Sequence, residues 1–307
     1  MKEKTFISIV AYAHNSEKTV TQFLENIHDF FFEKFESFEI ILVNDASTDK
    51  TLELITQYKE KYKGKVTVIT TAWKHNCELA MLAGTEMAIG DFIYEIDSTN
   101  LEFPIESLWD AYEKSATGFD IVFASPNGKL NMSSKIFYKI LGKFSYQKLE
   151  LRTESFKLIT RRALNTVLKS KDKNRYRKII YRFSGFPTAS IYFEPTKKIK
   201  SNMSLREKID LATGILLSFS DIGLKLTLFL SILFFIISVL IGIYTISIYL
   251  TERSIVVTGW TTTMLFLSFS FSGMFLILTI LGKYLTIILE ETKSRPSYFI
   301  QSIRRIK

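Results

Sequence analysis

The sequence of 307 residues is poor in the residues that hold small secreted or zinc-stabilised domains together. It has one cysteine, Cys77, only three histidines and five prolines. A single cysteine excludes an internal disulfide, and His14, His28 and His75 are too scattered to give the ligand spacing of a structural zinc site. The chain must therefore fold around a hydrophobic core, for which its 47% apolar and 14% aromatic content is sufficient.

Two long stretches near the C-terminus lack charged residues altogether. They cover residues 226–251 and 254–282. Each is longer than the ~20 residues that cross a hydrocarbon core of about 30 Å. We predict a two-helix transmembrane hairpin over residues 223–290. The alternative is a buried helical hairpin of a soluble domain.

Basic residues flank this hairpin on both sides. They are Lys197, Lys198, Lys200, Arg206, Lys208 and Lys225 before it, and Lys293, Arg295, Arg304, Arg305 and Lys307 after it. The connecting loop has only Arg253. The positive-inside rule predicts that both termini and the region before the hairpin are cytoplasmic, in a multi-pass protein of the inner membrane. These flanks account for much of the net charge of +9, so we expect a lipid bilayer and no nucleic acid as a partner.

The region before the hairpin alternates between strand and helix patterns. Strands are predicted at residues 6–13, 38–43, 65–71, 92–97 and 119–124, with helices between them. This alternation predicts an α/β fold with a mostly parallel sheet and flanking helices, over a cytoplasmic domain of residues 1–203.

The later part of the chain is less regular. A helix is expected at 134–146, a strand entering a helix at 155–168, and a strand at 189–195. Residues 204–222 have apolar side chains on one helical face. They are predicted to form a juxtamembrane helix that lies on the bilayer surface or packs against its own sheet. Residues 291–307 are expected to be a cytoplasmic tail.

Polar residues follow three of the predicted strands at their carboxyl ends. Asn15 comes after the first strand, Asp45 after the second and Asp97 after the fourth. Ligands of parallel sheets bind at such strand ends, so we expect Asp45 and Asp97 to converge on one edge. The alternative is that each residue only caps a helix or forms an Asx turn.

The two aspartates suit the two halves of a nucleotide-sugar. Asp45 can accept a hydrogen bond from a nucleobase N–H or a ribose hydroxyl. Asp97 can hold a divalent ion that bridges the phosphates and neutralises charge on the departing nucleoside diphosphate.

Five segments, in this order, resemble the blocks of a known enzyme family. They are "SIVAYAHNSEKTV", "EIILVNDASTDKT", "LAMLAGTEMAIGDFIYEIDS", "SFKLITRRAL" and "LGKYLTIILEETKSRPSYFI". The chain resembles family-2 polyprenyl-phosphate glycosyltransferases with two C-terminal transmembrane helices, which are similar to dolichol-phosphate mannose synthase and to bacterial lipid-phosphate glucosyltransferases.

The resemblance implies a GT-A type domain, a nucleotide-sugar donor, an undecaprenyl or other polyprenyl phosphate acceptor, and inverting transfer assisted by Mg²⁺ or Mn²⁺. It implies that Ala13 and Asn15 line the nucleotide pocket and that Asp45 contacts the nucleoside. Asp97 would be the catalytic carboxylate of the metal motif. The resemblance also implies an oligomer, and Gly273 and Gly282 in the second predicted span would allow close helix approach.

The chain departs from the family pattern at two acidic positions. The metal motif reads "DSTNLEFP", with Thr99 or Asn100 in place of a second aspartate. Thr99 and Glu102 are therefore the remaining candidate ligands beside Asp97. The aspartate common before the "Phe-Arg-Leu" block is replaced by Ser155, which leaves Glu154 as the candidate catalytic base. A phosphate acceptor is already anionic, so it needs a base less than an alcohol does. The alternative function is that of a catalytically impaired relative that acts as a binding partner or scaffold.

Two basic groups complete the set of candidates. Lys197, Lys198 and Lys200 are predicted to gather the lipid phosphate or the donor diphosphate, or only to set the membrane topology. A second group is interpreted as a solvated helix face: Arg161, Arg162, Arg175, Arg177 and Arg182.

Overall fold

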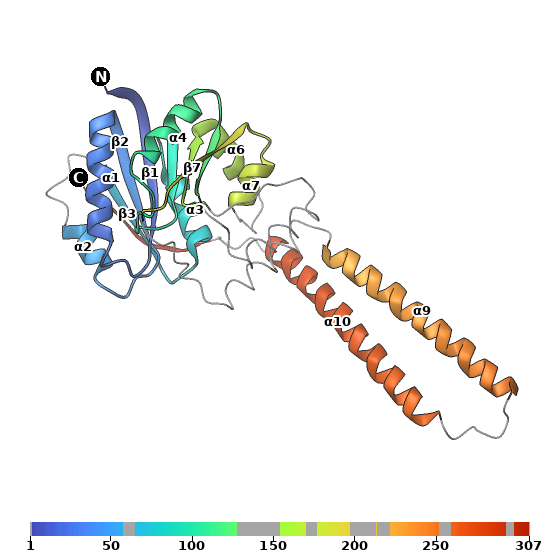
Figure 1. Cartoon of the computed structure of the whole chain (residues 1–307). Helices are drawn as coiled ribbons and strands as arrows, with labels where there is room; N and C mark the ends of the chain where they lie inside the picture. The colour runs from blue at the N-terminus through green and yellow to red at the C-terminus, as the bar shows by residue number, and fades with distance from the viewer. Residues whose placement is uncertain are drawn as a thin grey trace. The chain divides into compact units, whose positions relative to one another are not determined.

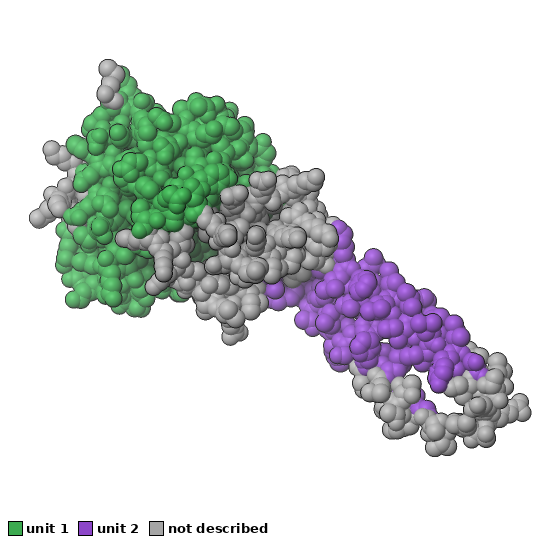
Figure 2. All heavy atoms as spheres, viewed as in Figure 1, with its two compact units in different colours: residues 1–138, 150–202, 295–307 green, residues 139–149, 203–294 purple. Residues whose placement is uncertain are grey.

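The computed structural model describes residues 2–57, 65–127, 154–169, 177–196, 213, 222–251, 259–292 and 298–306. The chain divides into two compact units (Figure 2). The first unit comprises residues 1–138, 150–202 and 295–307, and the second comprises residues 139–149 and 203–294. The predicted helix at 134–146, nearly all of the predicted helix at 204–222, and Lys197, Lys198 and Lys200 lie outside the described residues.

An eight-stranded sheet forms the centre of the first unit in the described part of the chain (Figure 1). In the order in which they lie side by side, its strands are β7 (Thr188–Phe193), β5 (Ile121–Pro126), β6 (Phe156–Thr160), β4 (Phe92–Ile96), β1 (Glu3–Ala13), β2 (Phe35–Asn44), β3 (Lys65–Thr71) and β8 (Ile300–Ile306).

The sheet is mostly parallel, as predicted. Strands β4, β1, β2 and β3 run parallel to one another, and β5 runs parallel to β7. Only β6 and β8 run antiparallel to their neighbours. All five strands predicted from the first 125 residues are present, although β2 begins three residues earlier than predicted, at Phe35.

Helices cover both faces of this sheet. One face packs against α1 (Val20–Lys34), α2 (Thr51–Gln57) and α4 (Ser107–Ala116), and the other against α3 (Cys77–Met87), α6 (Arg161–Lys169) and α7 (Arg177–Phe183). The alternation of side chains along a strand creates the two cores. In β2, for example, Ile40 and Leu42 belong to the first core, whereas Ile41 and Val43 belong to the second.

Helix α3 packs unusually close to the sheet because of Gly84. A Cβ at this position would lie 2.4 Å from Cγ1 of Val10 and 2.7 Å from Cγ2 of Val43. The absence of a side chain therefore sets the distance between α3 and strands β1 and β2. This spacing matters because the first residues of α3 lie at the carboxyl ends of the central strands.

The second unit contains two long helices that lie side by side (Figure 1), α9 (Ile222–Thr251) and α10 (Trp260–Thr292). They meet where Gly273 of α10 lies against Phe234 of α9, since a Cβ on Gly273 would come within 2.1 Å of the Phe234 ring. Gly282 has nothing within 4 Å of such a Cβ. Gly273 therefore serves the contact between the two helices of this chain.

One helix among the described residues is long and apolar enough to cross a membrane. It is the Phe269–Leu289 part of α10, which has a mean hydropathy of 1.9. None of its apolar window is buried inside the structure. In α9 the corresponding apolar stretch is the shorter Lys225–Ile241. Both helices expose large apolar side chains, including Phe235 at 69% and Phe275 at 64%.

Candidate active site

Asp45 follows the last residue of β2 and is completely buried. Its Oδ1 accepts hydrogen bonds from the Thr71 hydroxyl and from the backbone N–H of His75, both at 2.9 Å. Its Oδ2 accepts a bond from the Tyr12 hydroxyl at 3.0 Å. The backbone carbonyl of Asp45 accepts a bond of 2.7 Å from the ring of His14. His14 is therefore satisfied by the local backbone, and Asp45 fixes the ends of β1, β2 and β3 to one another.

The loops after β1 and β2 are joined to each other and hold two strained residues. Asn15 and Ala46 have φ angles of 48° and 47°, a left-handed region that non-glycine residues occupy at a cost. Asn15 accepts a bond at its Oδ1 from the Thr48 N–H at 2.9 Å, and its own N–H donates to the Ser47 hydroxyl at 3.0 Å. Such strain is concentrated at functional sites, so this loop pair is a candidate ligand-binding surface.

The predicted nucleotide-pocket residues occupy different depths in this loop pair. Asn15 is exposed, whereas Ala13 is only 1% exposed. The backbone carbonyl of Ala13 accepts a hydrogen bond of 2.9 Å from the N–H of Asp45. Asn15 is therefore accessible from outside the protein, whereas Ala13 lies in the core, and their roles toward a nucleotide stay predictions.

Asp97 follows the last residue of β4 and lies between two cationic side chains. Its Oδ1 accepts a bond of 2.7 Å from Arg177, and its Oδ2 accepts one of 3.3 Å from Lys157. Both cations come from the face that α3, α6 and α7 cover. Their side chains are 3% exposed, but the Asp97 side chain remains 31% exposed. Lys157 and Arg177 therefore hold Asp97 from the face that α3, α6 and α7 cover, and part of the Asp97 side chain stays accessible to solvent.

Arg177 connects three carboxylates into one buried network. Besides Asp97, its guanidinium bonds Glu95, which is completely buried in β4, and Glu78 at 3.0 Å. The Tyr181 hydroxyl donates to the other oxygen of Glu95. The first residue of α7 is thereby attached to α3 and to β4. The interpretation of the arginine group as a solvated helix face is wrong for Arg177, which is only 2% exposed. Arg162 has a side chain that is 71% exposed, and Arg175 lies outside the described residues.

The opposite charges in this network stabilise the charged forms of one another. Burial would raise the pKa of the Asp97 carboxyl, but Lys157 and Arg177 outweigh it and hold that pKa well below its ordinary value. Burial would lower the pKa of Lys157, but the Asp97 charge raises it above the ordinary value. Burial, with the charge of Asp97, raises the pKa of the Cys77 thiol, so that thiol is a poor nucleophile.

Asp45 and Asp97 lie at the same edge of the sheet. Strand β1 lies between β2 and β4, so the two residues are separated by two strand spacings, about 10 Å. The last residue of β2 pairs with Ala13 of β1, whereas the last residue of β4 pairs with Ala11. This offset of two residues adds about 7 Å along the strand direction. The loop before α3 and the first residue of this helix contact the two aspartates, since His75 of the loop bonds Asp45 and the sulfur of Cys77 lies 3.8 Å from the Asp97 carbonyl.

The candidate metal ligands do not form a protein-held metal site in the described part of the chain. Thr99 shares a hydrogen bond of 2.8 Å with Thr19, and Glu102 accepts one of 3.3 Å from Asn100. The described residues contain no group of three or more acidic, histidine or cysteine side chains that could hold a metal ion. The motif has two carboxylates, Asp97 and Glu102, and both oxygens of Asp97 already bond cations. These residues do not fit a resident divalent ion.

Glu154, the candidate base, lies just before β6, and its side chain is 3% exposed. Its Oε1 accepts a bond of 3.2 Å from Arg182 of α7. Arg182 in turn lies over the Phe123 ring, 4.2 Å from its centroid. Glu154 thus joins the carboxyl-end region to α7, near the Arg177 network.

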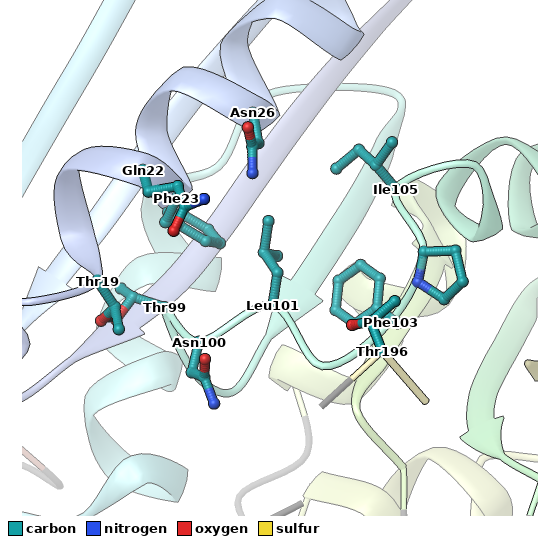
Figure 3. Close-up of a pocket in the computed structure, with 11 residues that line it drawn as sticks. Thr19, Gln22, Phe23, Asn26, Thr99, Asn100, Leu101, Phe103, Ile105 and Thr196 are labelled. Atoms are coloured by element: carbon teal, nitrogen blue, oxygen red, sulfur yellow. Dashed lines mark hydrogen bonds between the residues drawn. The ribbon is translucent and has the colours of Figure 1, made fainter. Parts of the chain in front are cut away.

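A separate pocket of about 240 Å³ lies between α1 and the loop that follows β4 (Figure 3). Gln22 and Asn26 of α1 point toward Leu101 across it. Thr99 and Asn100 belong to its lining, but Asp45 and Asp97 do not. The pocket therefore adjoins the divergent metal motif without including either aspartate.

The architecture is that of a GT-A type glycosyltransferase, with a mostly parallel sheet and polar residues at its carboxyl edge. The model of Glycosyl transferase family 2 matches residues 8–168, just over half of the chain, and the protein belongs to this family. It is a glycosyltransferase, as the resemblance of its motifs implied.

Relatives match almost the whole chain. An uncharacterized glycosyltransferase of Synechocystis sp. is 26% identical over 97% of this chain and 95% of its own length. The bactoprenol glucosyl transferase of Shigella phage SfX is 27% identical over 96% of this chain and 99% of its own.

Among solved structures, glucosyl-3-phosphoglycerate synthase from Mycobacterium tuberculosis, in complex with Mn²⁺, uridine diphosphate and phosphoglyceric acid, has a TM-score of 0.51. It is 15% identical and covers 69% of this chain and 76% of that one. This likeness shows the fold.

Proposed function

We propose that the protein transfers a sugar, with inversion, from a nucleotide-sugar donor to a polyprenyl phosphate such as undecaprenyl phosphate on the cytoplasmic leaflet. The observation that carries the proposal is the pair Asp45 and Asp97 at one sheet edge, in a family-2 chain that also has two long apolar helices. The name of the phage relative, a bactoprenol glucosyl transferase, supports the lipid acceptor.

The donor would lie along the sheet edge. The nucleoside would rest on the loops after β1 and β2 beside the exposed Asn15, with the buried Asp45 and Ala13 supporting these loops from behind, and the diphosphate would extend toward Asp97. The separation of the two aspartates, estimated at about 12 Å from strand spacing and register, gives the ligand room for both parts. Asp97 presents its exposed side to the diphosphate end.

The Mn²⁺ and uridine diphosphate bound together in the mycobacterial enzyme support a divalent cation in this reaction. Because the described residues contain no group of side chains that could hold a metal ion by themselves, we propose that the cation arrives with the donor phosphates as part of the substrate. Mg²⁺ in proteins is commonly held in this way, by one or two carboxylates together with phosphate oxygens. Asp97 is the protein ligand available to it, and Thr99 and Glu102 remain secondary candidates.

The acceptor phosphate attacks the sugar carbon from the side opposite the diphosphate. The new bond forms between a phosphate oxygen and that carbon as the bond to the nucleoside diphosphate breaks, so no covalent intermediate with the protein is needed. The phosphate is already anionic at neutral pH, and Glu154 then serves to orient the acceptor region more than to remove a proton. Lys197, Lys198 and Lys200 are proposed to attract the lipid phosphate.

The connectivity of the chain supports the proposed two-span topology. Residues 203–294 leave the first unit and return to it, because β8 belongs to the sheet of that unit. A chain that crosses a bilayer through α10 must cross it a second time to return. Helix α9 has 30 residues and extends about 45 Å, which is sufficient. Two spans would put both termini on one side, and we propose from the basic flanks of the hairpin that this is the cytoplasmic side of the inner membrane; assembly into a homo-oligomer stays a prediction.

One observation favours the alternative of a catalytically impaired scaffold. Asp97 is neutralised by Lys157 and Arg177, and the second acid of the motif is absent. A protein of this kind would bind a nucleotide-sugar without turning it over. The same experiment separates the two functions.

The test uses the full chain in lipid nanodiscs with and without undecaprenyl phosphate. Sugars linked to uridine, guanosine, thymidine and cytidine diphosphate are supplied with Mn²⁺, and released nucleoside diphosphate is measured. We expect release from one donor class, dependent on the lipid phosphate. Asp97→Asn should lower kcat/KM about 100-fold or more, whereas Asp110→Asn, on the exposed side of α4, should not change it. Binding without turnover across the panel would instead support the scaffold.

A further inference from the structure

The strand that follows the long helices, β8, is the last strand at one end of the sheet. It lies next to β3, whose Thr71 bonds Asp45. β8 pairs antiparallel with β3, and the register shifts just before Thr71, which lies opposite Ile300. Thr71 donates its hydroxyl to Asp45. We call residues 298–306 the return segment, because it is the described part of the chain that rejoins the first unit after α10.

The start of the return segment forms an aromatic cluster with the loop after β3. The Phe299 ring lies 4.8 Å from the Trp73 ring, centroid to centroid, and the Trp73 ring stacks on His75 at 5.2 Å with an interplanar angle of 12°. The Phe299 carbonyl also accepts a bond of 2.9 Å from the Ala72 N–H. Trp73 is 53% exposed and Phe299 43%, but the His75 side chain is only 5% exposed.

His75 connects this cluster to Asp45 through three hydrogen bonds. Its Nε2 accepts from the Phe299 N–H at 3.2 Å, and its Nδ1 donates to the Trp73 carbonyl at 2.7 Å. One neutral tautomer satisfies both ring bonds. The backbone N–H of His75 donates to Asp45 at 2.9 Å. Phe299 therefore bonds the ring of the same histidine whose backbone N–H bonds Asp45, and in this way it helps to set the orientation of the loop at Asp45.

A second contact attaches the return segment to α3. The Tyr298 hydroxyl donates to Glu86, near the end of that helix. Residues 298–300 thus touch β3, the loop after it, and α3. These are the elements that surround Asp45 on the side away from β1.

We infer that the return segment completes the nucleoside site and that Phe299 is a positioning residue for it. The inference rests on the proposed function only in that the ligand is the nucleoside part of a nucleotide-sugar. Phe299 packs on Trp73 and donates its N–H to His75, so the position of His75 depends on Phe299. The backbone N–H of His75 in turn donates to Asp45, which fixes the loop after β3. A loop ordered in advance loses less entropy when the ligand binds, so the ring of Phe299 increases donor affinity without touching the donor. A chain whose hairpin has not returned to the first unit has an incomplete donor site.

The test measures nucleotide binding to the full chain in nanodiscs by calorimetry, with uridine, guanosine, thymidine and cytidine diphosphates as probes. Phe299→Ala is compared with Ile303→Ala, since Ile303 lies in the same return segment and is 46% exposed. We expect Phe299→Ala to weaken binding of the preferred nucleotide about three- to tenfold, the range that one aromatic pair accounts for. Ile303→Ala should leave binding unchanged, and Phe299→Tyr should restore it.

Activity gives a second readout that a purely structural role would not produce. Phe299→Ala should raise the donor KM by the same factor and leave kcat at saturating donor within about twofold. If Phe299→Ala unfolds more readily than Ile303→Ala, Phe299→Leu provides the comparison, because it keeps apolar bulk without the ring. Equal affinities for Phe299→Ala and the unmodified chain, or equal losses in both alanine variants, would overturn the inference. Failure of the unmodified chain to bind any of the nucleotides would count against the proposed function instead.

Discussion

Replacement of Arg177 by methionine tests the buried charge network behind Asp97. Methionine retains an unbranched apolar stem but removes a guanidinium that bonds Glu78, Glu95 and Asp97. Before the change, these three carboxylates face two cations, Arg177 and Lys157. Afterwards three negative charges face one positive charge, and Glu95 is completely buried.

The expected loss of stability is large. Removing one partner of a buried ion pair costs about 3–5 kcal/mol, because the remaining charge is left without compensation. A domain of about 200 residues loses roughly 2–4 °C of melting temperature for each kcal/mol. We therefore expect Arg177→Met to melt roughly 6–20 °C below the unmodified protein, as measured by differential scanning fluorimetry with intrinsic tryptophan emission.

Two further variants decide whether the loss comes from charge. Arg305→Met, at an exposed position of β8, should leave the melting temperature within about 2 °C. The double variant Arg177→Met/Glu95→Gln should recover at least about 1 kcal/mol of the loss, because Glu95 no longer carries an unpaired charge. A loss below about 1 kcal/mol for Arg177→Met, or no recovery in the double variant, would refute the assignment of this network as a stabilising one.

Three other substitutions follow from packing and hydrogen bonding. Gly84→Val should lower the free energy of unfolding by about 2–3 kcal/mol in urea titrations, because a side chain there overlaps the sheet. Asp120→Asn should cost about 1–2 kcal/mol at pH 7. Hydrogen bonds from Arg162 lower the pKa of Asp120 in the folded state, so this difference should shrink as the pH falls below about 4. Gly273→Val should lower the melting temperature of the detergent-solubilised chain, whereas Gly282→Val should not, since only Gly273 lies against the neighbouring helix.

The sheet, and the edge at which the candidate site residues lie, could be predicted from the sequence because both depend on local patterns. Buried parallel strands are continuous apolar runs, and the residues that follow them fall at one edge whatever the strand order. Asp45 and Asp97 were placed correctly at that edge for this reason. Their individual roles toward a ligand stay predictions.

The surroundings of the two aspartates could not be predicted, because they depend on contacts between distant parts of the chain. Arg177 lies 80 residues from Asp97, and a run of basic residues in a short helix is typical of a solvated face. Its burial results from three carboxylates on α3, β4 and the following loop, whose convergence no spacing reveals. Likewise, nothing near Asp45 in the sequence indicates that Thr71 and His75 both donate to its Oδ1.

The strand β8 was missed for a definable reason. Its apolar residues Ile300, Ile303 and Ile306 recur every three positions, whereas a strand with one buried face alternates every two. The register shift beside Thr71 places an extra residue in the ladder, and only the tertiary structure shows it. The segment expected to be a cytoplasmic tail contains this edge strand, which the sequence pattern did not predict.

The last prediction concerns divalent ions and follows from the single carboxylate at Asp97. An ion held by one protein ligand and the donor phosphates should be bound weakly by the protein alone. We expect dialysis without chelator to remove it, and activity to return with Mn²⁺ at concentrations that rise in parallel with the donor concentration. Asp97→Asn should shift the required concentration of Mn²⁺ upward, because the remaining ligands are neutral or belong to the donor. One equivalent of metal per chain after dialysis, detected by elemental analysis, would contradict this reasoning and would require a ligand set beyond the described residues.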